Sequence, residues 1–144
     1  MNVLDLPPTT DSVPVARRFV RARLVDGLTD VDTATLLVSE VVTNAILHAR
    51  TSVRLTIEVA DDVVRIAVRD GSPVQPRIHS FSATSATGRG LRLLDRLAKR
   101  WGVYADPATG GKVVWFEVGE PSTSAWGEIS EDWLSEASGQ GRLD

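Results

Sequence analysis

An apolar-rich stretch of the chain contains three polar residues spaced four positions apart: Glu40, Asn44 and His48. Residues spaced i, i+4 and i+8 share one face of a helix, so this spacing presents a carboxylate and an amide side by side. An Asn oxygen is a suitable ligand for Mg²⁺, and a Glu can orient or deprotonate an attacking hydroxyl group or water molecule. The pattern therefore predicts chemistry at a metal-bound phosphate; the alternative is an ordinary solvated helix face.

Two further motifs fit a nucleotide. Asp70 ends a strand-like run and precedes Gly71; a carboxylate there can accept a hydrogen bond from the exocyclic amine of adenine, or the two residues simply form a turn. The run Thr87-Gly88-Arg89-Gly90-Leu91 begins a helical pattern, and the unpaired amides at a helix N-terminus favour phosphate oxygens. Arg89 either touches a phosphate or is solvated. The sequence contains neither a Gly-x-Gly-x-x-Gly motif nor a P-loop.

The hydropathy pattern predicts the elements that position these residues. We expect helices at 12–27, 30–48 and from 88 onward, and strands at 3–6, 53–59, 63–70, 101–104 and 113–118. The first helix is expected to have Ser12 as its N-cap and Val15, Phe19 and Ala22 on its apolar face. The loop 71–87 is longer than a compact domain uses without a purpose, which favours a functional or mobile loop. The order predicts an α/β fold: a two-layer sandwich whose mixed, mostly antiparallel sheet carries its helices on one face.

Length and composition limit the classes of protein to which this chain can belong. The chain has 144 residues, of which 42% are hydrophobic and 24% charged, which fits one soluble domain at 1–118 followed by an acidic tail at 119–144. The absence of cysteine excludes disulfide scaffolds, thiolate metal sites and a cysteine nucleophile, and agrees with a cytoplasmic location. No apolar run is long enough to span a membrane.

Charge is distributed unevenly along the chain. Residues 1–118 carry a formal charge of +2 and the tail carries −5, so the body lacks the basic surface that sequence-independent DNA binding requires. Within the tail, Trp126, Ile129 and Trp133 fall at i, i+3 and i+7 among acidic residues. This spacing predicts a short amphipathic helix; the alternative is a frayed terminus.

The order of these motifs resembles that of the GHKL, or Bergerat-fold, ATP-binding superfamily, over residues ~12–118. The helix segment Ser39-Glu40-Val41-Val42-Thr43-Asn44-Ala45-Ile46-Leu47-His48-Ala49 is most similar to the small, stand-alone anti-sigma factor serine kinases of actinobacteria. The chain departs from that family at its adenine motif. Where the family usually has Asp-x-Gly-x-Gly, this chain has Asp70-Gly71-Ser72-Pro73-Val74, so we expect nucleotide affinity to be weakened but not abolished.

The resemblance implies that ATP and Mg²⁺ are the cofactors. It makes Glu40 the general base and Asn44 the Mg²⁺ ligand. Adenine is then read at Asp70 and Gly71, and the phosphates are held by the segment Thr87, Gly88, Arg89, Gly90 and Leu91. By contrast, His48 is interpreted as a structural residue at the end of its helix.

The function implied is that of an anti-sigma factor that phosphorylates a serine or threonine of an antagonist protein. Its partners would be a sigma factor, the antagonist, or a second copy in a homodimer; neither a nucleic acid nor a membrane is expected. One alternative is a non-catalytic, partner-binding regulator on the same fold. A second is a histidine kinase catalytic fragment, although His48 lies inside the proposed ATP helix and His79 in the loop. Arg17 and Arg21 on the first helix either contact an acidic partner or form a solvated face.

Overall fold

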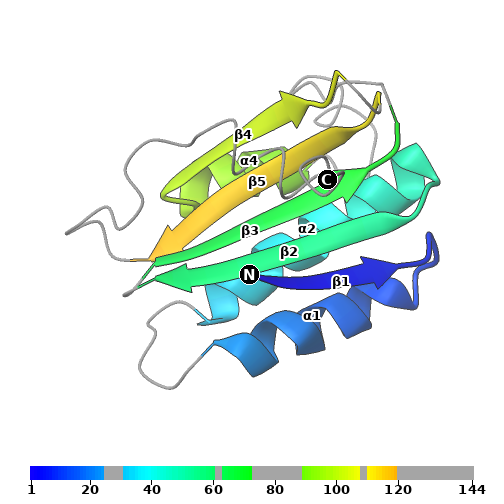
Figure 1. Cartoon of the computed structure of the whole chain (residues 1–144). Coiled ribbons are helices and arrows are strands. Elements are labelled where there is room, and N and C mark those ends of the chain that lie inside the picture. Colours follow the sequence, from blue (N-terminus) through cyan, green and yellow to red (C-terminus); the bar gives the residue numbers. More distant parts are fainter. Residues whose placement is uncertain (25–30, 61–62, 73–88, 108–109, 120–144) are drawn as a thin grey trace.

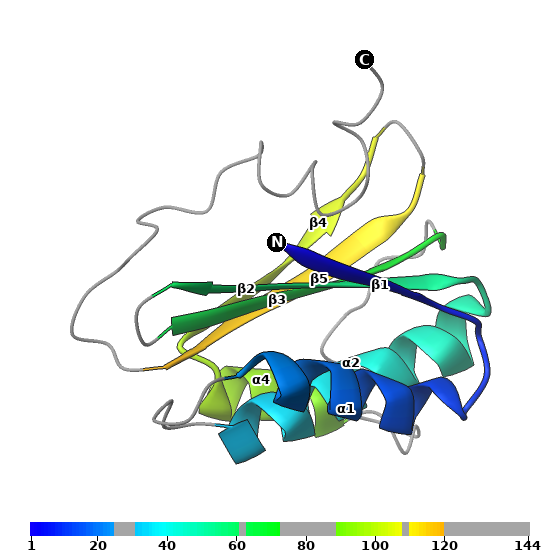
Figure 2. The same ribbon diagram turned by 60° about the horizontal axis from the view of Figure 1, so that its bottom comes forward.

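A computed structural model describes residues 1–24, 31–60, 63–72, 89–107 and 110–119 of the chain. Five strands form one sheet in the order β1-β2-β3-β5-β4, and every neighbouring pair is antiparallel. The three described helices all lie on one face of this sheet (Figures 1 and 2), which confirms the predicted two-layer α/β sandwich. In chain order, the elements are β1 (Asn2–Leu6), α1 (Ser12–Arg23), α2 (Val31–Ala49), β2 (Val53–Ala60), β3 (Val63–Asp70), α4 (Arg89–Leu97), β4 (Arg100–Ala105) and β5 (Lys112–Gly119).

Alternating apolar residues form the face of the sheet that packs against the helices. Val64, Ile66 and Val68 of β3 belong to the main core, together with Val114 and Phe116 of β5. Because successive strand residues point to opposite faces, these side chains all project toward the helices. The same alternation places Asp70 and Lys112, the last residue of β3 and the first of β5, on that face.

The helix α2 supplies most of the helical side of the core. Its buried apolar residues recur at helical spacing, and α2 contacts α1, α4 and β3. The helix begins at Val31, one residue after its predicted start, and residue 30 lies outside the described residues. The last turns of α2, which include Asn44, and the last residues of β3, which include Asp70, lie at the same end of the molecule (Figure 1).

Two details of α1 differ from the prediction. The helix begins at Ser12, with Asp11 in the N-cap position; the Ser12 hydroxyl donates to the carbonyl of Pro7 at 2.7 Å and thereby anchors the preceding turn. The buried apolar residues of the helix are Ala16 and Val20, whereas Ala22 is exposed. Val15 and Phe19 are partly buried and pack against the core, so the predicted apolar face was right for these two residues and wrong for Ala22.

The strand β5 lies between β3 and β4. With β4 it forms an antiparallel hairpin around the turn at Asp106, where Gly110 N donates to the Asp106 carbonyl at 2.9 Å. Its pairing with β3 joins residues 42 to 56 positions apart and brings Asp70 opposite Lys112. This long-range pairing determines the neighbours of Asp70.

Candidate nucleotide site

Glu40 and Asn44 lie one turn apart on α2, as their spacing predicts. Glu40 is half-buried, whereas Asn44 is only 8% exposed. The structure thus places Asn44 below the surface, in contrast to the solvated helix face that was the alternative. His48, one further turn along, is exposed.

The side-chain oxygen of Asn44 is buried and has no hydrogen-bond partner. A buried acceptor left in this state costs about 1–3 kcal/mol, and buried polar atoms in folded proteins are nearly always paired. The neighbouring Thr43 shows the usual solution, because its hydroxyl donates to the carbonyl of Ser39 at 2.6 Å. The Asn44 oxygen is therefore available to a ligand, and an amide carbonyl oxygen is a hard donor that suits Mg²⁺.

Asp70 is 2% exposed and forms an ion pair with Lys112. The Lys112 ammonium lies 3.0 Å from Oδ1 and 2.9 Å from Oδ2, and the backbone N–H of Ser72 donates to Oδ1 at 2.8 Å. A carboxylate offers about four lone-pair positions, so these contacts leave room for one further donor. The predicted adenine-reading carboxylate is buried as expected, but it already has a cationic neighbour.

The end of β3 is fixed by contacts from two other segments. The backbone N–H of Gly71 donates to the Thr51 hydroxyl at 2.8 Å, which ties this end of β3 to the segment that follows α2. On the other side, a Cβ placed on Gly111 would collide with the backbone carbonyl oxygen of Asp70. Glycine at position 111 thus permits the close approach of the two backbones.

The helix α4 begins with Arg89 and Gly90, as the Gly-x-Gly motif predicts. Its N-terminal end points toward the end of the sheet at which β3 ends (Figures 1 and 2). The amides of a first helical turn have no intrahelical acceptors and carry partial positive charge, which suits phosphate oxygens. Thr87 and Gly88, and almost all of the predicted loop 71–87, lie outside the described residues.

The sequence did not identify Lys112 or Thr51 as part of this site. Lys112 precedes the apolar strand residues, and its only signal in the sequence is a cation next to a Gly-Gly turn. Recognising it requires the register between β3 and β5, which pairs residues 42 positions apart.

Arg17 and Arg21, the predicted partner-binding residues, both reach toward α2. Arg17 donates to the Ser39 hydroxyl at 3.4 Å, and Arg21 donates to the Thr35 hydroxyl at 3.4 Å and lies 3.6 Å from a carboxylate oxygen of Asp32. Both remain exposed. They link the two helices, and their role toward a partner stays a prediction.

The described residues contain no metal centre made by protein side chains alone, because no three acidic or histidine side chains lie close together there. A Mg²⁺ ion held mainly by nucleotide phosphates needs only one or two protein ligands, so the single Asn44 oxygen fits that mode. None of the described helices combines the length and hydropathy needed to cross a membrane.

Comparison with known proteins identifies the domain. A search of curated proteins found no match. The family model of the histidine kinase-like ATPase domain matches residues 6–118, which include all the described helices and the strands β2 to β5 up to residue 118. Together with the antiparallel sheet and its one-sided helices, this match shows that the chain belongs to the histidine kinase-like ATPase domain family.

Proposed function

We propose that this protein binds ATP with Mg²⁺ and acts as an anti-sigma factor that phosphorylates a serine or threonine of an antagonist protein. The proposal of nucleotide binding rests on the side-chain oxygen of Asn44, which is buried and has no hydrogen-bond partner. Asn44 lies on the same face of α2 as Glu40. Family membership supports ATP as the ligand. The kinase activity and the partners rest on the resemblance of the Ser39–Ala49 segment to anti-sigma factor kinases.

Each residue of the site has a distinct role in this proposal. The Asn44 oxygen holds Mg²⁺, which neutralises charge on the phosphates when bound. Asp70 accepts a hydrogen bond from the exocyclic amine of adenine, and the backbone amides at the start of α4 face the phosphates. The Lys112 ammonium keeps the Asp70 carboxylate oriented through its contacts with both oxygens.

Phosphoryl transfer would then use Glu40 as the base. The acceptor hydroxyl oxygen bonds to the γ-phosphorus while the bond from that phosphorus to the bridging oxygen breaks, and ADP leaves with the bond electrons. The hydroxyl proton passes to the Glu40 carboxylate. Positioning of the two reactants supplies most of the acceleration in such a reaction.

A second candidate function is a non-catalytic regulator with reduced nucleotide affinity. The ion pair between Asp70 and Lys112 favours it, because the ammonium occupies acceptor positions that adenine would otherwise use. The Gly71-Ser72-Pro73 sequence, which differs from the glycine-rich motif usual in the family, points the same way.

Transfer of labelled γ-phosphate from ATP to purified serine-containing antagonist proteins distinguishes the two candidates. The kinase predicts labelling by the wild type and none by Glu40→Gln, although that variant still binds ATP because the base acts on the acceptor. Asn44→Ala loses both binding and transfer. ATP binding without transfer in the wild type would favour the non-catalytic regulator, and unchanged transfer in Glu40→Gln would remove Glu40 from the mechanism.

A further inference from the structure

The face of the sheet opposite the helices, here called the outer face, carries deeply buried residues. Thr56 is 0% exposed, Arg65 2% and Glu117 1%. All three alternate with core residues and therefore point away from the helices. An arginine on an open sheet face would remain largely solvated. Because α1, α2 and α4 lie on the other side (Figure 2), no described helix accounts for this burial.

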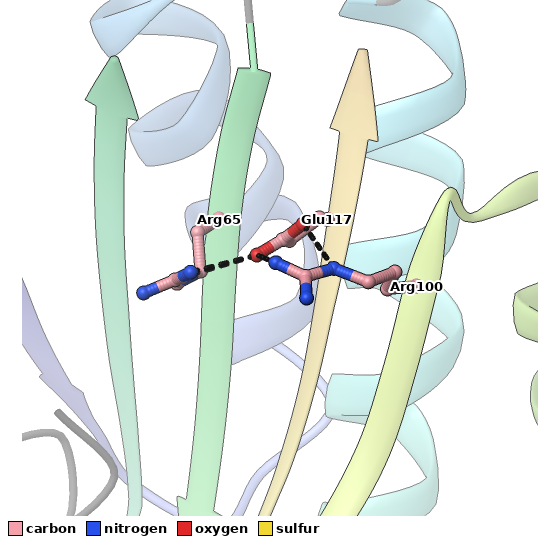
Figure 3. Close-up of polar contacts among 3 residues, drawn as sticks. All are labelled: Arg65, Arg100 and Glu117. Atoms are coloured by element: carbon pink, nitrogen blue, oxygen red, sulfur yellow. Dashed lines mark hydrogen bonds and ion pairs between the residues drawn. The ribbon is translucent and has the colours of Figure 1, made fainter. Parts of the chain in front are cut away.

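A cationic cluster occupies one part of the outer face. Arg65 and Arg100 both donate to the Glu117 carboxylate, with N···O distances of 2.8–3.0 Å (Figure 3). Two guanidinium groups thus share one carboxylate. In addition, the buried Nε of Arg69 and the buried hydroxyl of Thr56 have no hydrogen-bond partner. Buried groups of this kind call for a polar or acidic covering segment.

An apolar strip crosses the same face next to the cluster. Ala67 and Val113 are buried there, with Tyr104 and Trp115 packed against them. A Cβ placed on Gly102 would come within 2.9 Å of the Trp115 indole, so this ring lies across the glycine and close to the sheet. The outer face therefore combines an aromatic surface with a group of arginines, of which Arg65 and Arg100 share the Glu117 carboxylate.

We propose that the C-terminal segment 120–144 of the same chain docks on the outer face. The chain leaves β5 at Gly119, and β5 neighbours the central strand of the sheet. Five strands about 4.8 Å apart span ~20 Å, which a helix of about 12 residues covers. The 25 residues that follow Gly119 are therefore long enough to cross the face.

The sequence of this segment complements the surface. Trp126, Ile129 and Trp133 share one helical face and match the strip formed by Tyr104 and Trp115. The segment carries a net charge of −5, with Glu128, Glu131 and Asp132 between its apolar residues. These carboxylates suit Arg65, Arg69 and Arg100, because opposite charges steer and align two surfaces. The described part of the chain places this surface on the side of the sheet opposite Asn44, so the proposal is independent of nucleotide binding.

The absence of cysteine makes a direct test practicable, because a single introduced cysteine carries a unique nitroxide label. The label is attached to Ser130→Cys in the full chain, and methyl NMR peaks are compared before and after reduction of the nitroxide. Docking predicts that the Ala67 and Val113 methyl peaks lose most of their intensity. The Leu36 methyls, which are exposed on α2, keep theirs. Retained intensity at Ala67 and Val113 would overturn the proposal.

Two controls identify the occupant. In the labelled protein, Trp126→Ser/Trp133→Ser should restore the Ala67 and Val113 intensities while the remaining methyl spectrum shows that the domain is folded. Unchanged broadening in that variant would contradict docking through the apolar face of the segment. A mixture of labelled protein at natural isotopic abundance with unlabelled, isotope-enriched protein should show no broadening. Broadening in the mixture would mean that the segment of a second copy covers the face.

Discussion

At the scale of single residues, Asn44 stands out because its environment does not explain it. Its neighbours Val41, Val42 and Ala45 are buried apolar residues that contribute to the core. An amide among them, with an unpaired oxygen, costs the folded protein free energy that an apolar side chain would not. The proposed contact with Mg²⁺ would give this oxygen the partner that it lacks.

Replacement of Asn44 by Ala should separate stability from ligand binding. Without nucleotide, we expect the thermal midpoint to stay near that of the wild type, because removal of the unpaired buried oxygen offsets the packing lost on truncation of the side chain. The increase in midpoint that ATP and Mg²⁺ produce in the wild type should disappear, since that increase depends on binding to the folded state. Thermal unfolding with and without ATP and Mg²⁺ measures both effects.

Thr43→Ala is the matched control for this experiment. It removes a half-buried side chain from the same helix and loses a 2.6 Å hydrogen bond to the Ser39 carbonyl. We expect the free energy of unfolding to fall by about 1 kcal/mol and the thermal midpoint to fall with it. The increase in midpoint on addition of ATP and Mg²⁺ should be preserved. If Asn44→Ala kept the full response, its oxygen would not be a ligand.

At the scale of elements, ion pairs join strands that are distant in the sequence. Lys112 links β5 to Asp70 of β3, and Glu117 links β5 to Arg65 of β3 and Arg100 of β4 (Figure 3). Buried pairs of this kind contribute little as a pair, yet loss of one partner leaves an uncompensated charge in the interior. The strand β5 is therefore the element whose placement depends most on charge.

A double-mutant cycle on Asp70 and Lys112 tests this dependence. Asp70→Asn and Lys112→Met should each lower the free energy of unfolding by about 3–5 kcal/mol, because each leaves its partner buried and unpaired. The double variant should lose clearly less than the sum of the two single losses. Urea unfolding provides the values. Additive losses would show that the two charges do not interact in the folded protein.

The edge strand β1 forms an ion pair at the surface, and the contribution of this pair to stability depends on pH. Arg54 donates to the Asp5 carboxylate at 2.8 Å, and this hydrogen bond lowers the pKa of Asp5 below 3.8 despite partial burial. A lowered pKa in the folded state stabilises the protein above the unfolded value, and this stabilisation is lost as the pH falls through the folded pKa. The same contact raises the pKa of Arg54.

Asp5→Asn should therefore destabilise the protein only when the carboxylate of the wild type is ionised. Because the pair is solvent-exposed, we expect a loss of about 0.2–1 kcal/mol at pH 7. The difference between the two proteins should begin to shrink near pH 3.8 and vanish below the folded pKa of Asp5. Urea unfolding across this range checks the sign. A difference that persists in acid would assign the effect to packing of the side chain.

The sequence predicted the elements well where apolar periodicity is strong. The alternation in β2, β3 and β5 and the broad apolar face of α2 locate these segments within one or two residues. On α1 the predicted apolar face included the exposed Ala22 and omitted the buried Ala16 and Val20, because arginines separate the apolar residues in the second half of this helix. The position of β5 between β3 and β4, and with it the contact of Lys112 with Asp70, depends on long-range pairing that no local pattern specifies.

At the scale of the whole molecule, the two faces of the sheet have different environments. The helix-facing side holds the main core and, at the end where β3 finishes, Asn44, Asp70 and the first turn of α4. The outer face holds the cationic cluster and the aromatic strip. Ligand binding on the first side and docking of the C-terminal segment on the second are therefore separate properties, and each can fail without the other.

Isothermal titration of the wild-type protein with ATP in the presence and absence of Mg²⁺ tests the central claim most directly. The account predicts saturable heat for one site per chain that depends on Mg²⁺ and is absent in Asn44→Ala, because the Asn44 oxygen is the protein's ligand to the ion. The altered adenine motif predicts a modest affinity, so the titration should extend to ATP concentrations of about 1 mM. The absence of Mg²⁺-dependent heat in the wild type at these concentrations would contradict the account.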